Sequence, residues 1–209
     1  MTAESIDRQT HWQKVYRTRT ADSVSWYRPH LDVSIELLGL AGLSANSRVI
    51  DIGGGASTLV DDLLDRGIRD VSVLDVSDDA LTMARTRLGD RAIEVNWYVA
   101  DVLHAGLPAG GFDLWHDRAT FHFLTDPAGA IRYAQLAAEA VRIGGHAVIG
   151  GFAPDGPERC SGLPVTRRSA EDIAGVFASR FSLLRKREER HRTPAGTEQS
   201  FEYALMLRS

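Results

Sequence analysis

The sequence predicts an α/β protein with a doubly wound, mostly parallel sheet of seven strands, helices on both faces and an antiparallel C-terminal hairpin strand. From residue 48 onward, short apolar strand patterns alternate with amphipathic helix patterns, as in a parallel sheet. A glycine-rich run, VIDIGGGAST (49–58), joins the first strand to its helix. Two further strand patterns, FSLLRKREERHR and QSFEYALMLRS, are joined by TPAGTEQ (193–199) and predict the closing hairpin.

The individual elements follow from periodicity. Two helices are expected before the sheet, at 4–16 and 30–42, with the aromatic loop SVSWYRPH between them. The alternating elements then follow in the order strand 48–52, helix 57–66, strand 70–75, helix 78–88, strand 94–100, strand 112–116, helix 126–141, strand 145–151 and helix 169–178. We expect a helical and aromatic lid segment over 1–29 and a single domain over 30–209.

Composition narrows the class of protein. A hydrophobic fraction of 44% and a charged fraction of 25% are ordinary for a globular protein. The net charge of -4 argues against a nucleic-acid partner, and the polar N-terminus lacks the pattern of a secretory signal. No run approaches the roughly 18 apolar residues of a membrane span, so we expect a cytoplasmic protein without a membrane partner. Oligomeric state is left open.

The single cysteine, Cys160, limits the metal and redox chemistry that the chain can support. One cysteine excludes an internal disulfide and a multi-cysteine metal site, and we expect no metal. Cys160 lies in the loop FAPDGPERCSGLPV, where an incidental cysteine and an acceptor-side thiol are both open interpretations.

The ends of the predicted strands indicate a nucleotide site, because ligands of such sheets bind beyond the carboxyl ends of the strands. The glycine turn lets a ligand approach the backbone, and the N–H groups at the helix start favour polar groups. Asp75 ends its strand where an acidic side chain can accept hydrogen bonds from both ribose hydroxyls. Asp101 is placed to accept from an adenine amino group while Val102 packs on the ring. The alternative role for both aspartates is to cap a turn or helix.

Two common nucleotide sites fit the glycine run poorly. The third position of the dinucleotide fingerprint falls on Thr58 instead of glycine, and no Gly-Lys-Ser/Thr follows as in a P-loop. Both departures argue against an NAD site and a P-loop.

Taken in order, the motifs resemble the class I S-adenosylmethionine-dependent methyltransferases over residues 30–209. VIDIGGGAS resembles the Asp-x-Gly-x-Gly turn of that family, VLDVS its ribose acid, VAD its adenine contact and GFDLWHDRATFHFL its fourth-strand motif. RIGGHAVIG resembles the turn into the fifth strand. The resemblance implies S-adenosyl-L-methionine as cofactor, held by Asp51, Gly53, Gly54, Gly55, Asp75, Val76, Asp101, Val102 and His116.

The segment HDRATFHFL (116–124) is expected to face the methyl acceptor. Asp117, His122 and His116 are candidates to steer the acceptor or take its proton, although a lone histidine is more often structural. The expected walls of the acceptor site are Phe121 and Phe123, with Trp26 and Tyr27 from the lid loop. Methyl transfer from a sulfonium depends chiefly on positioning, so a strong base is not required.

The sequence leaves three functions open. We expect methyl transfer to a nucleophilic small molecule, such as a thiol, selenol or amine. VSWY (24–27) also resembles small protein lysine methyltransferases, whereas HDRATFHFL departs from their pattern. From a different class, the chain could be a non-catalytic nucleotide-binding partner subunit. The sequence does not select the acceptor atom among S, Se, N and O.

Overall fold

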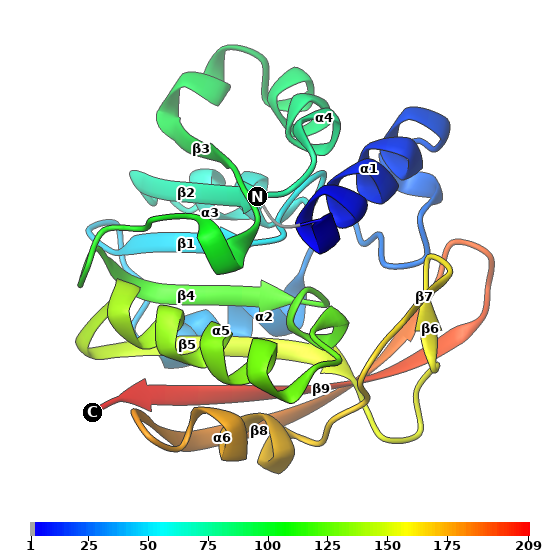
Figure 1. Ribbon diagram of the computed structural model, residues 1–209. Coiled ribbons are helices and arrows are strands. Elements are labelled where there is room, and N and C mark those ends of the chain that lie inside the picture. The colour runs from blue at the N-terminus through cyan, green and yellow to red at the C-terminus, as the bar shows by residue number, and fades with distance from the viewer. Residues whose placement is uncertain (1–2) are drawn as a thin grey trace.

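The computed structural model describes residues 3–209 and contains a seven-stranded sheet in the order β3-β2-β1-β4-β5-β9-β8 (Figure 1). Strands β1 to β5 are mutually parallel, and β9 runs antiparallel to both β5 and β8. The strands are β1 (Arg48–Ile52), β2 (Asp70–Asp75), β3 (Val95–Val99), β4 (Phe112–Arg118), β5 (Val141–Phe152), β8 (Phe181–Arg192) and β9 (Glu198–Arg208). The predicted fold, including the C-terminal hairpin, is confirmed.

Helices cover both faces of the sheet (Figure 1). One face packs against α2 (Asp32–Leu40), α3 (Leu59–Asp65) and α4 (Asp78–Leu88), and the other against α5 (Pro127–Ala140) and α6 (Ala170–Phe177). Successive side chains of a strand point to opposite faces, so Ile50 packs with the α5 and α6 side while Val49 packs with the α2 to α4 side. The central strands are therefore apolar on both faces, as in other parallel sheets.

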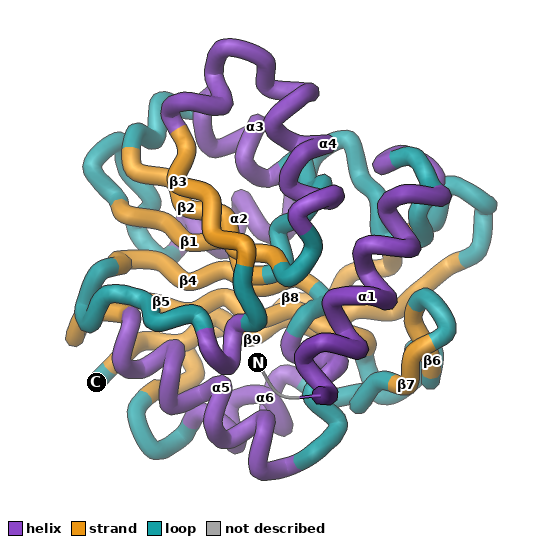
Figure 2. Tube along the Cα trace, turned by 45° about the horizontal axis from the view of Figure 1, so that its top comes forward, coloured by secondary structure: helices purple, strands orange, loops and turns teal. Residues whose placement is uncertain are grey.

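The N-terminal segment lies across the end of the sheet at which the parallel strands finish (Figures 1 and 2). Helix α1 (Ala3–Thr18) packs beside α4, and Arg17 Nε donates to Asp79 at 2.8 Å. Tyr16 clusters with Ala56 and Ala80, which belong to the glycine turn and α4. A short 3-10 helix, η1 (Ala21–Ser23), precedes the loop that leads back to α2.

Two regions differ from the sequence prediction. Strand β5 begins at Val141, directly after α5, and continues through Gly144, which has φ +76°, with a shift of its pairing with β4 between Phe112 and Leu114. The loop after β5 also contains a small hairpin, β6 (Arg159–Cys160) with β7 (Leu163–Pro164). Its turn residues Ser161 and Gly162 both have positive φ, as a two-residue hairpin of the primed type requires.

Further short 3-10 helices have no clear sequence signal: the first joins α4 to β3, and the others follow the ends of β3 and β4. They are η2 (Gly89–Glu94), η3 (Val102–His104) and η4 (Phe121–Phe123). Aspartates shape two of them: Asp101 accepts from Leu103 N at 3.0 Å, and Asp117 accepts from Phe121 N at 3.0 Å. Carboxylates next to strand ends therefore have capping roles as well as access to ligands.

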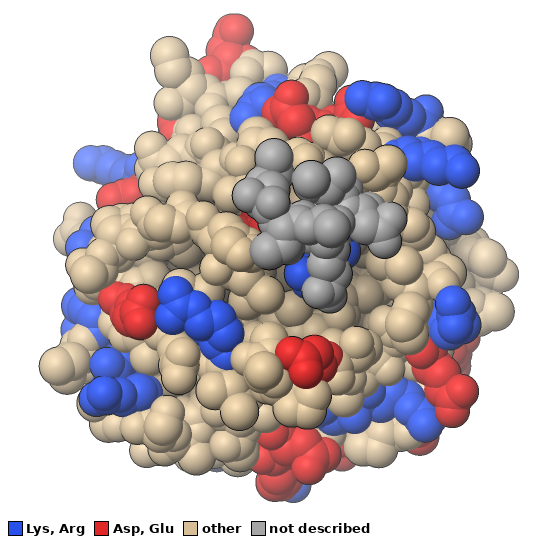
Figure 3. Space-filling view, viewed as in Figure 1, with Lys and Arg blue, Asp and Glu red and all other residues tan. Residues whose placement is uncertain are grey.

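Charge is evenly mixed on the surface seen in Figure 3, where basic and acidic side chains of the described residues are interspersed. Several of these charges form surface ion pairs, for example Arg87 with Asp61 and Arg91 with Asp65. Among residues 3–209, no helix combines the length and apolar character that spanning a membrane would require.

Gly150 and Gly151 of β5 give a matched test of the packing. A Cβ at Gly150 would lie 2.4 Å from the ring of Tyr203, its partner across the β5–β9 ladder, whereas a Cβ at Gly151 would meet His122 at 3.4 Å. We expect Gly150→Ala to cost about 1–3 kcal/mol by overpacking, which lowers Tm by roughly 2–4 °C per kcal/mol, and Gly151→Ala to melt close to wild type. Thermal melts in which the two variants lose the same stability would contradict this packing.

Candidate functional site

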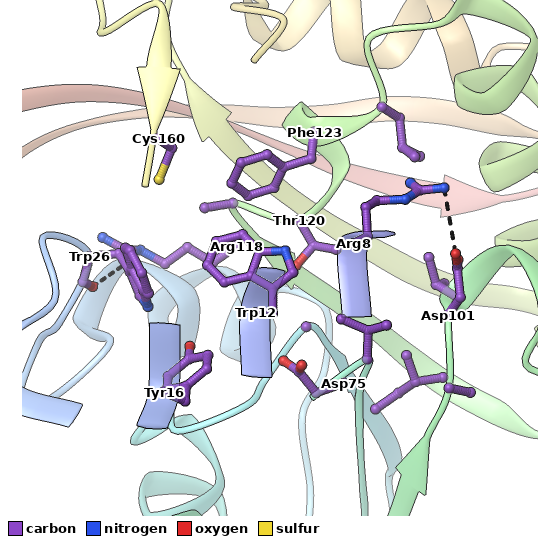
Figure 4. A pocket seen from close by; sticks show the side chains of 17 residues that line it. Arg8, Trp12, Tyr16, Trp26, Asp75, Asp101, Arg118, Thr120, Phe123 and Cys160 are labelled. Carbon is purple, nitrogen blue, oxygen red and sulfur yellow. Dashed lines mark hydrogen bonds and ion pairs between the residues drawn. The ribbon is translucent and has the colours of Figure 1, made fainter. Parts of the chain in front are cut away.

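A cavity of about 810 Å³, partly open to solvent, lies at the carboxyl ends of the parallel strands (Figure 4). We call it the main cavity. Its strand side is formed by Gly53, Leu74, Asp75, Val76, Ala100, Asp101 and Val102. Its opposite side is formed by residues of the N-terminal segment, namely Arg8, Trp12, Tyr16 and Trp26. The site is therefore built where the chain order of the strands reverses, between β1 and β4.

A second cavity of about 480 Å³ adjoins the first. The two share Tyr16, Trp26, Gly53 and Arg118 as lining residues. The second cavity is also lined by Asp51, Gly54, His116 and Tyr27. A ligand that filled both cavities would extend from the space beside Val102 to the glycine turn.

The glycine turn is bare because protein side chains occupy the space beside it. Gly53 has φ +65°, and a Cβ there would lie 1.7 Å from Thr120 Oγ1. A Cβ at Gly54 would lie 2.5 Å from Asp51 Oδ2. The N–H groups of Gly53 and Gly54 both donate to Leu74 O, at 2.7 and 3.2 Å. The N–H groups of these two glycines are therefore bonded within the protein, and side-chain packing explains the absence of Cβ atoms.

Asp75 ends β2 and lines the main cavity while being almost fully buried. Its Oδ1 accepts from Ser77 N at 2.8 Å. Burial raises the pKa of Asp75 to about 7, and the neighbouring Asp51 adds to this effect. Hydroxyl donors from a ligand would stabilise the ionised form of this carboxyl, so they would bind to it favourably.

Asp101 lines the same cavity and contacts the N-terminal segment. Its Oδ2 lies 3.5 Å from Arg8 Nη2 and has no hydrogen-bond partner, although it is buried. Figure 4 marks this ion pair, which joins the strand side of the cavity to α1. Buried carboxylate oxygens are normally hydrogen bonded, so Asp101 Oδ2 is available to a donor from a ligand.

Asp51 and His116 form a buried pair at the wall of the second cavity. His116 Nδ1 donates to Asp51 Oδ1 at 2.7 Å, and its Nε2 is hydrogen bonded to Ser34 Oγ at 2.8 Å. Both ring nitrogens are thus engaged by the protein, and the pair fixes the Asp51 carboxylate beside the glycine turn. In this arrangement His116 orients Asp51.

Aromatic rings form the wall opposite the strand ends. The Trp12 ring centroid lies 5.2 Å from that of Phe123 and 5.7 Å from that of Trp26, in edge-to-face geometry. The Tyr16 ring centroid lies 6.4 Å from the ring centroids of both tryptophans. Burial and the neighbouring Asp75 raise the pKa of Tyr16, so its phenol is neutral and can donate a hydrogen bond. All of these rings except Phe123 come from the N-terminal segment (Figure 4).

The structure brings most of the residues proposed from sequence to one of the two cavities. Those at the main cavity are Gly53, Asp75, Val76, Asp101, Val102, Trp26 and Phe123, and those at the second are Asp51, Gly53, Gly54, His116, Trp26 and Tyr27. Gly55 and Phe121 line neither. Gly55, with φ +40°, makes room for Asp75 Oδ2, and Phe121 packs in the core against Tyr133 and Phe177.

Asp117 and His122 do not lie where the sequence placed them, because both are buried away from the cavities. Asp117 accepts from Thr120 N, from Phe121 N and, at 2.5 Å, from Tyr133 Oη. His122 packs against Phe123 and Phe152, and burial lowers its pKa to about 3. In place of the expected acceptor-side pair, the structure has an aspartate that caps η4 and a buried, neutral histidine that lines neither cavity.

Sequence reasoning did not single out Arg8 and Thr120, which line the main cavity. The cavity is also lined by Trp12, Tyr16, Arg118 and Cys160, for which the sequence left a functional role open. The aromatic content of the N-terminal segment was a signal for Trp12 and Tyr16, whereas Arg8 had none. Burial raises the pKa of the Cys160 thiol to about 12, which makes it a poor nucleophile at neutral pH. Among the side chains that the structure describes, from residue 8 onward, no three from His, Cys, Asp or Glu are grouped to hold a metal ion.

Comparison with known families agrees with this geometry. A family model described as a methyltransferase domain matches residues 49–145, which include the glycine turn, Asp75, Asp101 and β4. Among curated proteins, the chain is similar to the eEF1A lysine and N-terminal methyltransferase of Danio rerio, with 22% identity over 142 residues. That match covers 68% of this chain and 20% of the relative, so the chain spans about a fifth of that protein's length.

Solved structures share the fold over nearly the whole chain. One, from a study of the conversion of a disulfide bond into a thioacetal group during echinomycin biosynthesis, has a TM-score of 0.74 and 21% identity, covering 97% of this chain and 92% of that one. Another is the N-methyltransferase NodS from Bradyrhizobium japonicum in complex with S-adenosyl-L-homocysteine. Its TM-score is 0.69, with 17% identity, and it covers 94% of this chain and 97% of its own.

The position of Asp117 predicts a stability defect instead of a catalytic one. We expect Asp117→Asn to leave the Tyr133 hydroxyl or a buried amide without its acceptor, at a cost of about 1–3 kcal/mol, while calorimetric affinity for S-adenosyl-L-homocysteine is unchanged in the folded protein. Thermal melts and titrations below the transition measure the two effects. A variant that melts like wild type but loses turnover would contradict this prediction and indicate a catalytic role for Asp117.

Proposed function

We propose that this chain is a class I S-adenosylmethionine-dependent methyltransferase that transfers the methyl group to a nucleophilic small molecule, a thiol, selenol or amine. When bound, S-adenosyl-L-methionine supplies a methyl group on a positively charged sulfonium. The observation that carries the proposal is the main cavity, in which strand-end carboxylates face an aromatic wall from the N-terminal segment. The match to a methyltransferase family model makes a non-catalytic partner role the weaker hypothesis.

The residues at the strand ends fit the cofactor. Asp75 would accept hydrogen bonds from the ribose hydroxyls. It is a buried carboxyl, and the contacts described above for it include a backbone N–H but no cation. The unpartnered Asp101 Oδ2 would accept from the adenine amino group, with Val76 and Val102 on the ring faces. Asp51, oriented by His116, would bind the ammonium of the methionyl end in the second cavity.

The aromatic wall supports the transfer step. Trp12, Trp26 and Phe123 are the rings that a sulfonium or an acceptor in the main cavity would meet. A cation near an aromatic face gains roughly 0.5–2 kcal/mol, more where water is excluded. The same wall would position a compact acceptor and shield it from water. We propose residues 1–29 as the lid of this site, consistent with the contributions of Arg8, Trp12, Tyr16 and Trp26 to its lining.

A small acceptor is favoured over a protein side chain because α1 lies across the strand ends, where a protein substrate would have to dock (Figure 2). Among the similar folds are a protein described for disulfide-to-thioacetal conversion and an N-methyltransferase. Transfer to lysine or to a protein N-terminus remains the second candidate, since the curated relative acts there according to its name. The shared region is a small part of that relative, so its substrate does not follow from the match.

The first test concerns Asp75 and pH. Ribose hydroxyls stabilise the ionised carboxylate, so binding lowers its pKa below the value of about 7 in the free protein. Affinity for S-adenosyl-L-homocysteine is therefore expected to be full above about pH 7 and to fall by up to about tenfold per pH unit below it, with proton release on binding. Calorimetry in buffers of different ionisation enthalpy measures both.

Matched aspartate variants of β2 provide the control. Asp75→Asn should weaken binding about 10- to 100-fold at about pH 8 and abolish the pH dependence between about pH 5 and pH 8. Asp70→Asn, at the exposed opposite end of the same strand, should behave like wild type. Retention of the wild-type pH profile by Asp75→Asn would assign the titration to another group and remove Asp75 from the ribose site.

The second test concerns the acceptor. Methyl-labelled S-adenosyl-L-methionine would be incubated with a panel of small thiols, selenols and amines, and separately with lysine-containing peptides and intact eEF1A. We expect label in the small-molecule fraction, and we expect Trp12→Ala to reduce this transfer because an acceptor wall is lost. Label found in protein alone would favour the second candidate.

A further inference from the structure

We infer that a buried network, formed by Arg118, Tyr203, Glu189 and Arg28, positions the N-terminal segment over the cavities, and that Arg28 and Glu189 are positioning residues for methyl transfer. The inference rests on the proposed lid role of residues 1–29. Its residues are far apart in the sequence: Arg118 ends β4, Glu189 lies on β8, Tyr203 lies on β9 and Arg28 lies in the aromatic loop.

The network begins at the cavity wall. The Arg118 side chain is 6% exposed and lines both cavities. Its Nη1 donates to the carbonyl oxygen of Trp26 at 2.9 Å, a bond marked in Figure 4, and its Nε donates to Tyr203 Oη at 2.9 Å. Its guanidinium also stacks over Phe201, with Cζ 4.5 Å from the ring centroid. Arg118 therefore joins the backbone of the residue that carries the Trp26 ring to the end of the sheet.

The network then passes through the C-terminal hairpin and returns to the segment. Tyr203 Oη donates to Glu189 Oε2 at 2.6 Å, and Arg28 Nη1 donates to Glu189 Oε1 at 2.9 Å. Glu189 is thus a buried carboxylate between two arginines, since Arg118 Nη2 also lies 3.8 Å from its Oε2. Charge-assisted bonds of this kind are the stronger ones, and removal of one partner leaves the others without compensation.

Two additional bonds fix the same loop. His191 of β8 donates from Nε2 to the carbonyl oxygen of Ser25 at 2.6 Å, and Thr58 Oγ1 donates to the carbonyl oxygen of Arg28 at 2.8 Å. The loop is therefore bonded to the main domain at Ser25, Trp26 and Arg28. These bonds hold the backbone on both sides of Trp26, whose ring contacts Trp12 and Tyr16.

Arg28 gives the mildest test, because it is 27% exposed and can be changed without removing a core side chain. We expect Arg28→Gln to increase tryptic cleavage after Arg17 and Arg19 about tenfold or more under native conditions, since a charge-assisted bond is lost. We expect kcat to fall about tenfold, with a smaller change in the Kd of S-adenosyl-L-homocysteine, whose proposed contacts to the strand ends are intact. Arg28→Lys, which keeps the charge, should restore most of both properties.

Arg187→Gln is the matched control, because Arg187 of β8 forms an exposed ion pair with Glu36 of α2 at 3.4 Å. It should keep wild-type cleavage after Arg17 and Arg19 and wild-type kcat. The inference is overturned if Arg28→Gln shows wild-type proteolysis and turnover, or if it is indistinguishable from Arg187→Gln. Cleavage and S-adenosyl-L-homocysteine binding need no acceptor, so a failure of the acceptor proposal would leave these two readouts unaffected.

Discussion

Convergence of acidic side chains at one edge of the sheet is the constraint on which the site depends. Parallel pairing brings the carboxyl ends of β1, β2 and β3 together, and with them Asp51, Asp75 and Asp101. Each is buried or nearly so, and the protein compensates them unequally. His116 donates to Asp51, and Arg8 lies beside Asp101, whereas Asp75 accepts from a backbone amide and has its pKa raised to about 7. Asp75 has the weakest charge compensation of the three, so a ligand with two hydroxyl donors would stabilise its ionised form most.

The N-terminal segment completes the cavities and is also part of the charge balance. It supplies Arg8 to Asp101 and three aromatic rings to the wall, and it receives Arg118 and His191 at its backbone carbonyls. The terminal hairpin therefore has a second use beyond closing the sheet, because Glu189 and Tyr203 hold the arginines that meet the loop. In this arrangement a few polar contacts link the position of the N-terminal segment to the shape of the two cavities.

Much of the fold could be predicted from sequence, since alternating apolar patterns fix strands such as β1 and β2 and the hairpin had a clear turn signal. The strand-end aspartates followed from the same topology. Asp117 and His122 were misplaced because one residue along β4 reverses the facing of a side chain, and η4 turns the following segment into the core. Arg8 and Glu189 could not be found, because their roles depend on contacts across 93 and 161 residues of chain, between Arg8 and Asp101 and between Arg28 and Glu189.

Amide hydrogen exchange with and without S-adenosyl-L-homocysteine tests the central claim, that strand ends and N-terminal segment form one ligand-binding unit. The account predicts that the ligand slows amide exchange both around Asp75 and Asp101 and throughout residues 8–28, because the N-terminal segment would be held against the bound ligand. Protection confined to the strand ends, with residues 8–28 exchanging at the same rate in both states, would contradict it.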